Sequence, residues 1–201
     1  FVVPALAGRQ SLGVPMVRGS AEASGVDIGG TRIDTARVTA TVENGATEFQ
    51  ASARGPDLDL TGAGSLAADG TAQVVRLARL SGSAFGFPVN LAAPATVRMD
   101  GGETTLSDVS LAVGGGRIAV AGSVGTEIAV DAVIDQVAGA FIDRFADGLG
   151  AEGVISGRAT VSGTPAAPRA QWRIDWTGFN VAAARNAGVP AMNLNASGVA
   201  S

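Results

Sequence analysis

Apolar and polar residues alternate along most of the chain. In residues 37–42 the apolar side chains take the even positions Val38, Ala40 and Val42, and residues 48–53 repeat the alternation. A period of two is typical of a β-strand that has one apolar face and one solvated face. We therefore expect short antiparallel strands over much of the sequence.

The same period continues toward the end of the chain, and turn signals separate the segments. Alternating segments lie at residues 57–61, 85–91, 109–113, 118–122, 128–134 and 172–176. Between them stand dipeptides that favour tight hairpin turns, namely Asn44-Gly45, Asp69-Gly70 and Asp100-Gly101, and the triple glycine 114–116. This spacing predicts an all-β meander of antiparallel strands.

On the predicted strands the apolar positions form one stripe, and two interpretations of it stay open. The stripe is either the core of an ordinary sandwich or barrel, or the lining of a gutter that stays open. Only 4% of the residues are aromatic, which leaves few bulky rings to fill a sandwich core. The candidate lining residues, including two from the helix described next, are Val38, Ala40, Val42, Phe49, Ala51, Phe85, Phe87, Val89, Leu91, Val109, Leu111, Val113, Ile118, Val120, Ile128, Val130, Ile134, Phe141, Phe145, Trp172, Ile174 and Trp176.

One segment departs from the period of two. Val137, Phe141 and Phe145 follow one another at intervals of four residues, and Gly148 stands where a helix would end. This spacing predicts a short amphipathic helix over residues 137–147, inserted between strands.

Composition excludes several kinds of site. The chain has no His, Cys or Tyr, and all 14 basic residues are Arg. Zinc, haem and iron–sulfur sites, catalytic triads, Schiff-base lysines and Walker lysines are therefore not expected. A formal charge of −4 argues against a nucleic-acid partner. We expect no cofactor and no catalytic residue.

Acidic residues supply the remaining candidates for chemistry. Asp57 and Asp59 resemble the start of a calcium loop, but Ala68 stands where the closing Glu belongs. A strand with its leucines on one face and its aspartates on the other explains the same residues. The pairs Asp131/Asp135 and Asp143/Asp147 have spacings suited to acid–base work, and we expect both to lie on solvated faces.

Three passages, taken in order, resemble the C-terminal region of the TamB family, within the AsmA-like superfamily. They are residues 85–99, then the strand–glycine–strand repeat at 106–124, and then the predicted helix followed by Ser156-Gly157 to Gly163-Thr164 and Pro168. The resemblance covers about residues 75–201, and the first seventy residues resemble the family only in the general character of their sequence, without a specific motif.

The resemblance implies a periplasmic part of a large Gram-negative envelope protein that is anchored in the inner membrane outside this sequence. Its sheet would form a taco-shaped gutter, resembling a β-helix, that carries phospholipid toward the outer membrane and meets a barrel partner of the TamA type. It would have no cofactor, and phospholipid or detergent could be bound to it. The alternative is a chaperone-like module that hands β-strands of outer-membrane proteins or autotransporters to that barrel. A carbohydrate-active enzyme is disfavoured, because a substrate cleft needs paired inward carboxylates.

These expectations divide the chain into three parts of one gutter. Residues 1–35 hold irregular structure and the first strands, residues 36–136 a meander, and residues 137–201 the helix and further strands. We also expect the sequence to be a piece of a longer protein.

Overall fold

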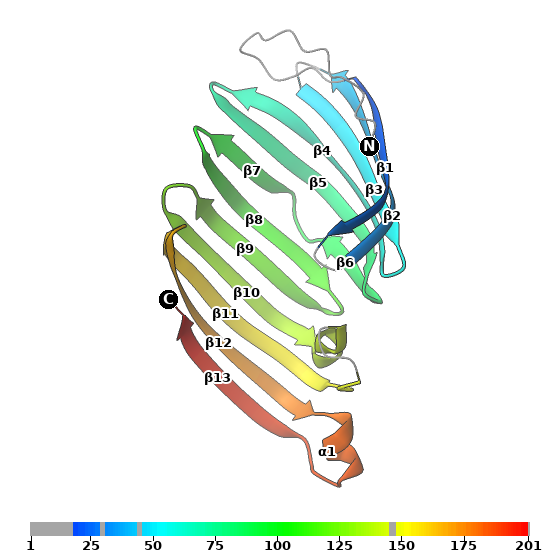
Figure 1. Ribbon diagram of the computed structural model, residues 1–201, viewed down its shortest axis with the longest axis vertical. Coiled ribbons are helices and arrows are strands. Elements are labelled where there is room, and N and C mark those ends of the chain that lie inside the picture. Colours follow the sequence, from blue (N-terminus) through cyan, green and yellow to red (C-terminus); the bar gives the residue numbers. More distant parts are fainter. Residues whose placement is uncertain (1–17, 29–30, 44–45, 145–147, 201) are drawn as a thin grey trace.

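The computed structural model describes residues 18–28, 31–43, 46–144 and 148–200, and these form one antiparallel sheet (Figure 1). The sheet has 13 strands, and its long axis runs across them. The strands are curved, and their direction changes from β1 to β13, so the sheet is twisted and curled. The prediction of an all-β, curled antiparallel sheet is confirmed.

The strands follow one another in space almost as they do in the sequence, with β1 and β13 at the two edges. Their bounds are β1 Gly19–Ile28, β2 Thr31–Glu43, β3 Ala46–Gly55, β4 Leu58–Asp69, β5 Ala72–Ala84, β6 Phe87–Leu91, β7 Ala95–Asp100, β8 Glu103–Val113, β9 Gly116–Val124, β10 Ile128–Ala138, β11 Glu152–Thr164, β12 Ala167–Asn180 and β13 Met192–Ala200.

Strands β6 and β7 occupy one position in the sheet. Both pair with β5 on one side and with β8 on the other, so together they act as one interrupted strand. The interruption contains Pro94, which has no N–H to give to a ladder.

Three of the four tight hairpins that the sequence indicates are present, and the fourth, at Asn44-Gly45, lies outside the described residues. β4 and β5 meet at Gly70, β7 and β8 at Gly101-Gly102, and β8 and β9 at Gly114-Gly115. These glycines have positive φ angles, which hairpin turns of two residues require.

The amphipathic helix expected at 137–147 is wrong in type and extent. The structure has a 3₁₀ helix, η1, at Gly139–Arg144, and Val137 belongs to β10, where it pairs with Ile155. Gln136 has a positive φ of 52°, and the register shifts between Ile134 and Val137. This bulge turns Val137 onto the face that Ile134 occupies, so the interval of four residues to Phe141 arises without an α-helix. Residues 145–147 lie outside the described residues.

The strand expected at 85–91 begins two residues later than the alternation suggests. Phe85 and Gly86 form the turn between β5 and β6, with φ angles of 55° and 81°. The backbone N–H of Phe85 donates a 2.7 Å hydrogen bond to the carbonyl oxygen of Asp57 in the neighbouring turn. Phe85 is therefore a turn residue, because a hairpin at this point needs two residues with positive φ.

A short helix, α1 (Ala182–Asn186), was not predicted. It spans only five residues between β12 and β13, too few for a periodic signal to stand out in the sequence. In Figure 1, α1 and η1 lie at the same ends of the strands.

Candidate functional site

The strand register divides the sheet into an apolar and a polar face. Paired residues of neighbouring strands point to the same side of a sheet, and residues alternate along each strand. By this rule the predicted lining residues that lie in strands all fall on one side, which we call the apolar face: Val38, Ala40, Val42, Phe49, Ala51, Phe87, Val89, Leu91, Val109, Leu111, Val113, Ile118, Val120, Ile128, Val130, Ile134, Trp172, Ile174 and Trp176.

Bulges keep apolar residues on this face across four of the five register shifts between paired strands. These four lie between Ala63 and Gly64, between Leu106 and Val109, between Ile134 and Val137, and between Trp176 and Phe179. Each of them returns an apolar residue to the same side, which a strict period of two would not do at these points.

One row of paired residues crosses the apolar face from β2 to β13. At about 4.8 Å per strand the row is about 48 Å long. Thr47 is its one polar member among the paired residues. In order, the row consists of Val42, Thr47, Leu66, Val75, Val97, Leu106, Gly122, Val130, Val161, Ala170 and Ala200.

Charged side chains are confined to the other face and to the strand ends. From Ala36 of β2 onward, no charged side chain that the structure describes lies on the apolar face within the paired strands. Arg32 and Asp34 stand at the start of β2, where they form an exposed ion pair of 2.9 Å. A continuous uncharged surface is what contact with a hydrocarbon requires.

Much of the apolar face has no covering layer. The exposed fraction is 42% for Val38, 41% for Val124 and 38% for Trp172, and reaches 48% for Met192. No large side chain of the described residues is fully buried. An ordinary sandwich would cover these positions with a second sheet.

η1 covers the apolar face at one end of the strands, which we call the closed end. The rings of Phe141 in η1 and Phe87 in β6 contact each other edge to face, with their centroids 5.6 Å apart. Near them the face is closed, because Val89, Val113, Val137 and Ile155 are all buried. Phe141 therefore lies on the apolar face as expected, but it covers the sheet instead of lining an open surface.

Hydrogen bonds hold this cover to the strand ends. The backbone N–H of Ala151 donates to a carboxylate oxygen of Asp143 at 2.9 Å, and the indole N–H of Trp176 donates to the carbonyl oxygen of Glu152 at 2.8 Å. Asp143 is half-buried, so the expectation of a solvated position is wrong for this residue: its carboxylate is needed by the chain that follows η1. Asp147 and Phe145 lie outside the described residues.

The other acidic candidates take structural positions. Asp131 and Asp135 are exposed on the polar face, and Asp131 accepts a hydrogen bond from the hydroxyl of Thr160 at 3.1 Å. Asp59 points away from the apolar face and forms an ion pair of 3.4 Å with Arg54. Among the described residues no group of three or more acidic side chains is placed to hold a metal ion.

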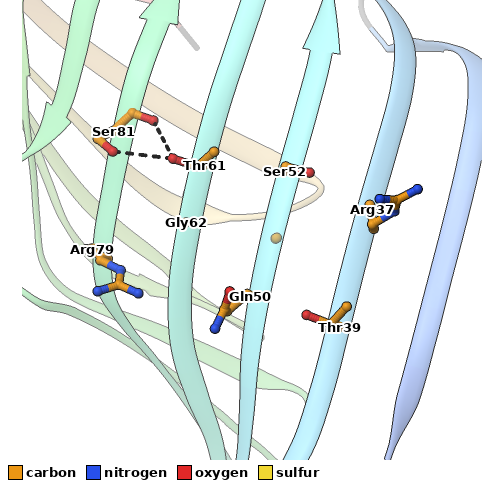
Figure 2. Close-up of a pocket in the computed structure, with 9 residues that line it drawn as sticks. Arg37, Thr39, Gln50, Ser52, Thr61, Gly62, Arg79 and Ser81 are labelled. Atoms are coloured by element: carbon orange, nitrogen blue, oxygen red, sulfur yellow. Dashed lines mark hydrogen bonds between the residues drawn. The ribbon is translucent and has the colours of Figure 1, made fainter.

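The polar face contains a second feature that the sequence analysis missed. A hollow of about 350 Å³ lies over β2–β5, and Figure 2 shows the side chains around it. It is lined by Arg37, Thr39, Gln50, Ala51, Ser52, Thr61, Gly62, Arg79 and Ser81. Of these, Ala51 and Gly62 belong by register to the apolar face, and the other seven to the polar face. The polar residues that alternate with the apolar ones in these strands could have indicated this hollow, but the sequence analysis considered them only as a solvated face.

Comparison with known proteins identifies no relative. No family model, curated protein or solved structure matches the chain. In the part of the chain that the structure describes, no helix has the length and hydropathy to cross a membrane.

Proposed function

We propose that the apolar face binds the acyl chains of phospholipids and that this chain is the periplasmic segment of a TamB-like conduit between the inner and outer membranes. The observation that supports this most is the row from Val42 to Ala200, which is apolar but for Thr47 and runs across the strands without a charge. A hydrocarbon chain lying along this row meets no charged side chain, and Thr47 on β3 is the one polar residue that it contacts.

The energy of lipid extraction explains why such a face would be needed. A phospholipid with two acyl chains has about 30 methylene groups, and exposing each to water costs about 0.8 kcal/mol, so extraction costs on the order of 24 kcal/mol. Contacts to a headgroup alone do not offset a cost of this size. A continuous apolar face offsets it along the whole path and leaves the headgroup in water. Closing of the curled sheet into a taco-shaped gutter belongs to the same proposal.

The edge of the sheet favours a second candidate function. Strand β13 (Met192–Ala200) has no charged residue and no proline, the two common protections of an edge strand. Its outer backbone groups pair with no strand that the structure describes, and such groups can accept an added strand. This supports a module that hands β-strands to a barrel partner of the TamA type.

Lipid that co-purifies with the chain tests the conduit. We expect mass spectrometry of the extracted wild-type protein to find stoichiometric phospholipid, and Val130→Arg to remove most of it. Val130 lies within the row, between Gly122 and Val161, so an arginine there places a charge in the path. The matched control is Ala129→Arg, the adjacent residue on the polar face of the same strand, which should retain the lipid. Lipid that is absent from the wild type, or equally retained by both variants, would contradict the proposal.

The two tryptophans report where the acyl chains lie. Trp172 is 38% exposed on the open part of the face, whereas Trp176 lies beside Gly139 and bonds to the chain after η1. Phospholipids with brominated acyl chains should quench Trp172 in a Trp176→Phe variant several-fold more than Trp176 in a Trp172→Phe variant. Equal quenching of the two indoles would place the lipid elsewhere.

A further inference from the structure

The hollow on the polar face owes its shape to side chains of unequal length. Two rows of paired residues cross β2–β5 there: Arg37, Ser52, Thr61 and Ser81, and next to them Thr39, Gln50, Ala63 and Arg79. The short side chains of Ser52 on β3 and of Thr61 and Ala63 on β4 form the floor, and Gln50 stands beside them. The two guanidinium groups stand on the flanking strands β2 and β5 (Figure 2).

The charge on this hollow is unbalanced. No acidic residue is among the side chains that line it. Arg79 makes no hydrogen bond or ion pair with any residue that the structure describes. Arg37 bonds to Glu22 on β1 at 2.9 Å, and this hydrogen bond, with the charge of Glu22, raises the pKa of the guanidinium. Both partners of that pair are exposed, and such pairs are weak, so Arg37 is free to turn toward a ligand.

Hydrogen-bond capacity surrounds the two arginines. The hydroxyl of Thr61 makes only long contacts, of 3.3 Å to the carbonyl oxygen of Ser81 and 3.4 Å to its hydroxyl. The side chains of Thr39, Gln50 and Ser52 bond to no described residue. The floor therefore offers several donors between two cations.

Besides Glu22, which pairs with Arg37, a second acid lies in an adjoining hollow. Glu48 lines that hollow together with Arg79 and Gln50. Its carboxylate competes with any anion for the guanidinium of Arg79. An anion bound in the main hollow must therefore offer more acceptor oxygens than one carboxylate.

From this arrangement we infer that the polar face of β2–β5 is a binding site for a phosphate group. A phosphate has enough acceptor oxygens to engage Arg79, Arg37 and the hydroxyl floor together, and guanidinium groups bind it through two parallel hydrogen bonds. No aromatic ring among the lining residues offers a surface for stacking, so the phosphate itself is what the site recognises. The group is carried either by free phosphate or by a lipid headgroup. This inference does not depend on lipid binding at the opposite face.

Titration with inorganic phosphate, followed by calorimetry, tests the site directly. We expect binding that weakens about tenfold in Arg79→Gln and changes less than twofold in Arg158→Gln. Arg158 is the matched control, since it is an exposed arginine on the same face of β11. Glu48→Gln should tighten binding, because it removes the competing carboxylate. Far-UV circular dichroism checks that the variants stay folded.

Vesicle flotation identifies the source of the phosphate. Vesicles of phosphatidylglycerol and of phosphatidylcholine are compared, with the same variants. Binding of vesicles that Arg79→Gln abolishes and Arg158→Gln does not, without binding of inorganic phosphate, assigns the site to a headgroup; the converse assigns it to free phosphate. If neither probe binds, or if both arginine variants lose binding equally, the inference is wrong. If Arg79→Gln loses phosphate binding but still co-purifies with lipid, then phosphate binding at the polar face and lipid binding at the apolar face are independent of each other.

Discussion

Gly122 illustrates how single residues keep the apolar face continuous. It lies in the row from Val42 to Ala200, between Leu106 and Val130, and its φ angle is +137°. A Cβ at this position would collide with the carbonyl oxygen of Ala129 on the neighbouring strand. The close approach of the two strands therefore requires glycine at this position.

We expect Gly122→Ala to lower the free energy of unfolding by about 1–3 kcal/mol, because the variant combines an unfavourable φ with a clash against backbone. Urea unfolding measures the change. Gly70→Ala is the control: its φ is +65°, and a Cβ there meets nothing within 4 Å, so only the conformational strain of about 1 kcal/mol remains. If both variants lower the free energy of unfolding by the same amount, the clash with Ala129 contributes nothing to the loss.

At the scale of elements, η1 decides which part of the apolar face is closed. It is short, so its own hydrogen bonds stabilise it little. It also has no acidic residue in its first turn to interact with the helix dipole. The contact of Phe141 with Phe87 and the bond from Ala151 to Asp143 hold it in place. Beneath it the sheet is buried, and beyond it the same face is open.

Phe141→Ala should lower the free energy of unfolding by about 2 kcal/mol, toward the low end for phenylalanine because the ring is half-buried. Thermal or urea unfolding measures this. Val199→Ala removes an apolar side chain that is 75% exposed on β13 and should change stability by less than about 0.5 kcal/mol. A loss no larger in Phe141→Ala than in Val199→Ala would mean that η1 contributes nothing to the closed end.

At the scale of the whole molecule, the sheet is one layer with unequal faces. Exposed ion pairs such as Arg54–Asp59 and Arg173–Asp175 lie on the polar face. The apolar face lacks both charges and a second layer over most of its length. An apolar surface of this extent promotes association unless something covers it.

Without a bound amphiphile the protein should associate in a concentration-dependent way. Sedimentation velocity in buffer is expected to show species larger than the monomer, and a nonionic detergent should return them to the monomer. Val130→Arg should reduce association, and Ala129→Arg, on the polar face, should leave it unchanged. A monomer in buffer that carries no amphiphile would show that the apolar face is protected by some other means.

Several features of the fold and of the candidate surface follow from local sequence. Alternation fixes which side of a strand each residue takes, so the positions Ile128, Val130 and Ile134 could be assigned to one face before any strand was paired. Turn glycines such as Gly70 and Gly101 likewise mark hairpins, because positive φ is a property of the residue itself.

Other features depend on contacts between distant residues, which no local period records. Phe85 has the alternation of a strand, but pairing of β5 with β6 makes it a turn. Val137 has the spacing of a helix, but its pairing with Ile155 makes it a strand residue. The hollow between Arg37 and Arg79 arises only when β2–β5 lie side by side, because these residues come from different hairpins.

The sequence by itself determined that the chain forms strands with one uncharged apolar face, because the period of side chains along a strand is local. It left open whether that face is a closed core or an open surface. Only the tertiary structure decided this: the strands join one sheet, no second layer covers most of it, and η1 closes one end. Packing between layers is a property of the assembled chain, and a pattern along one strand carries no information about what lies above it.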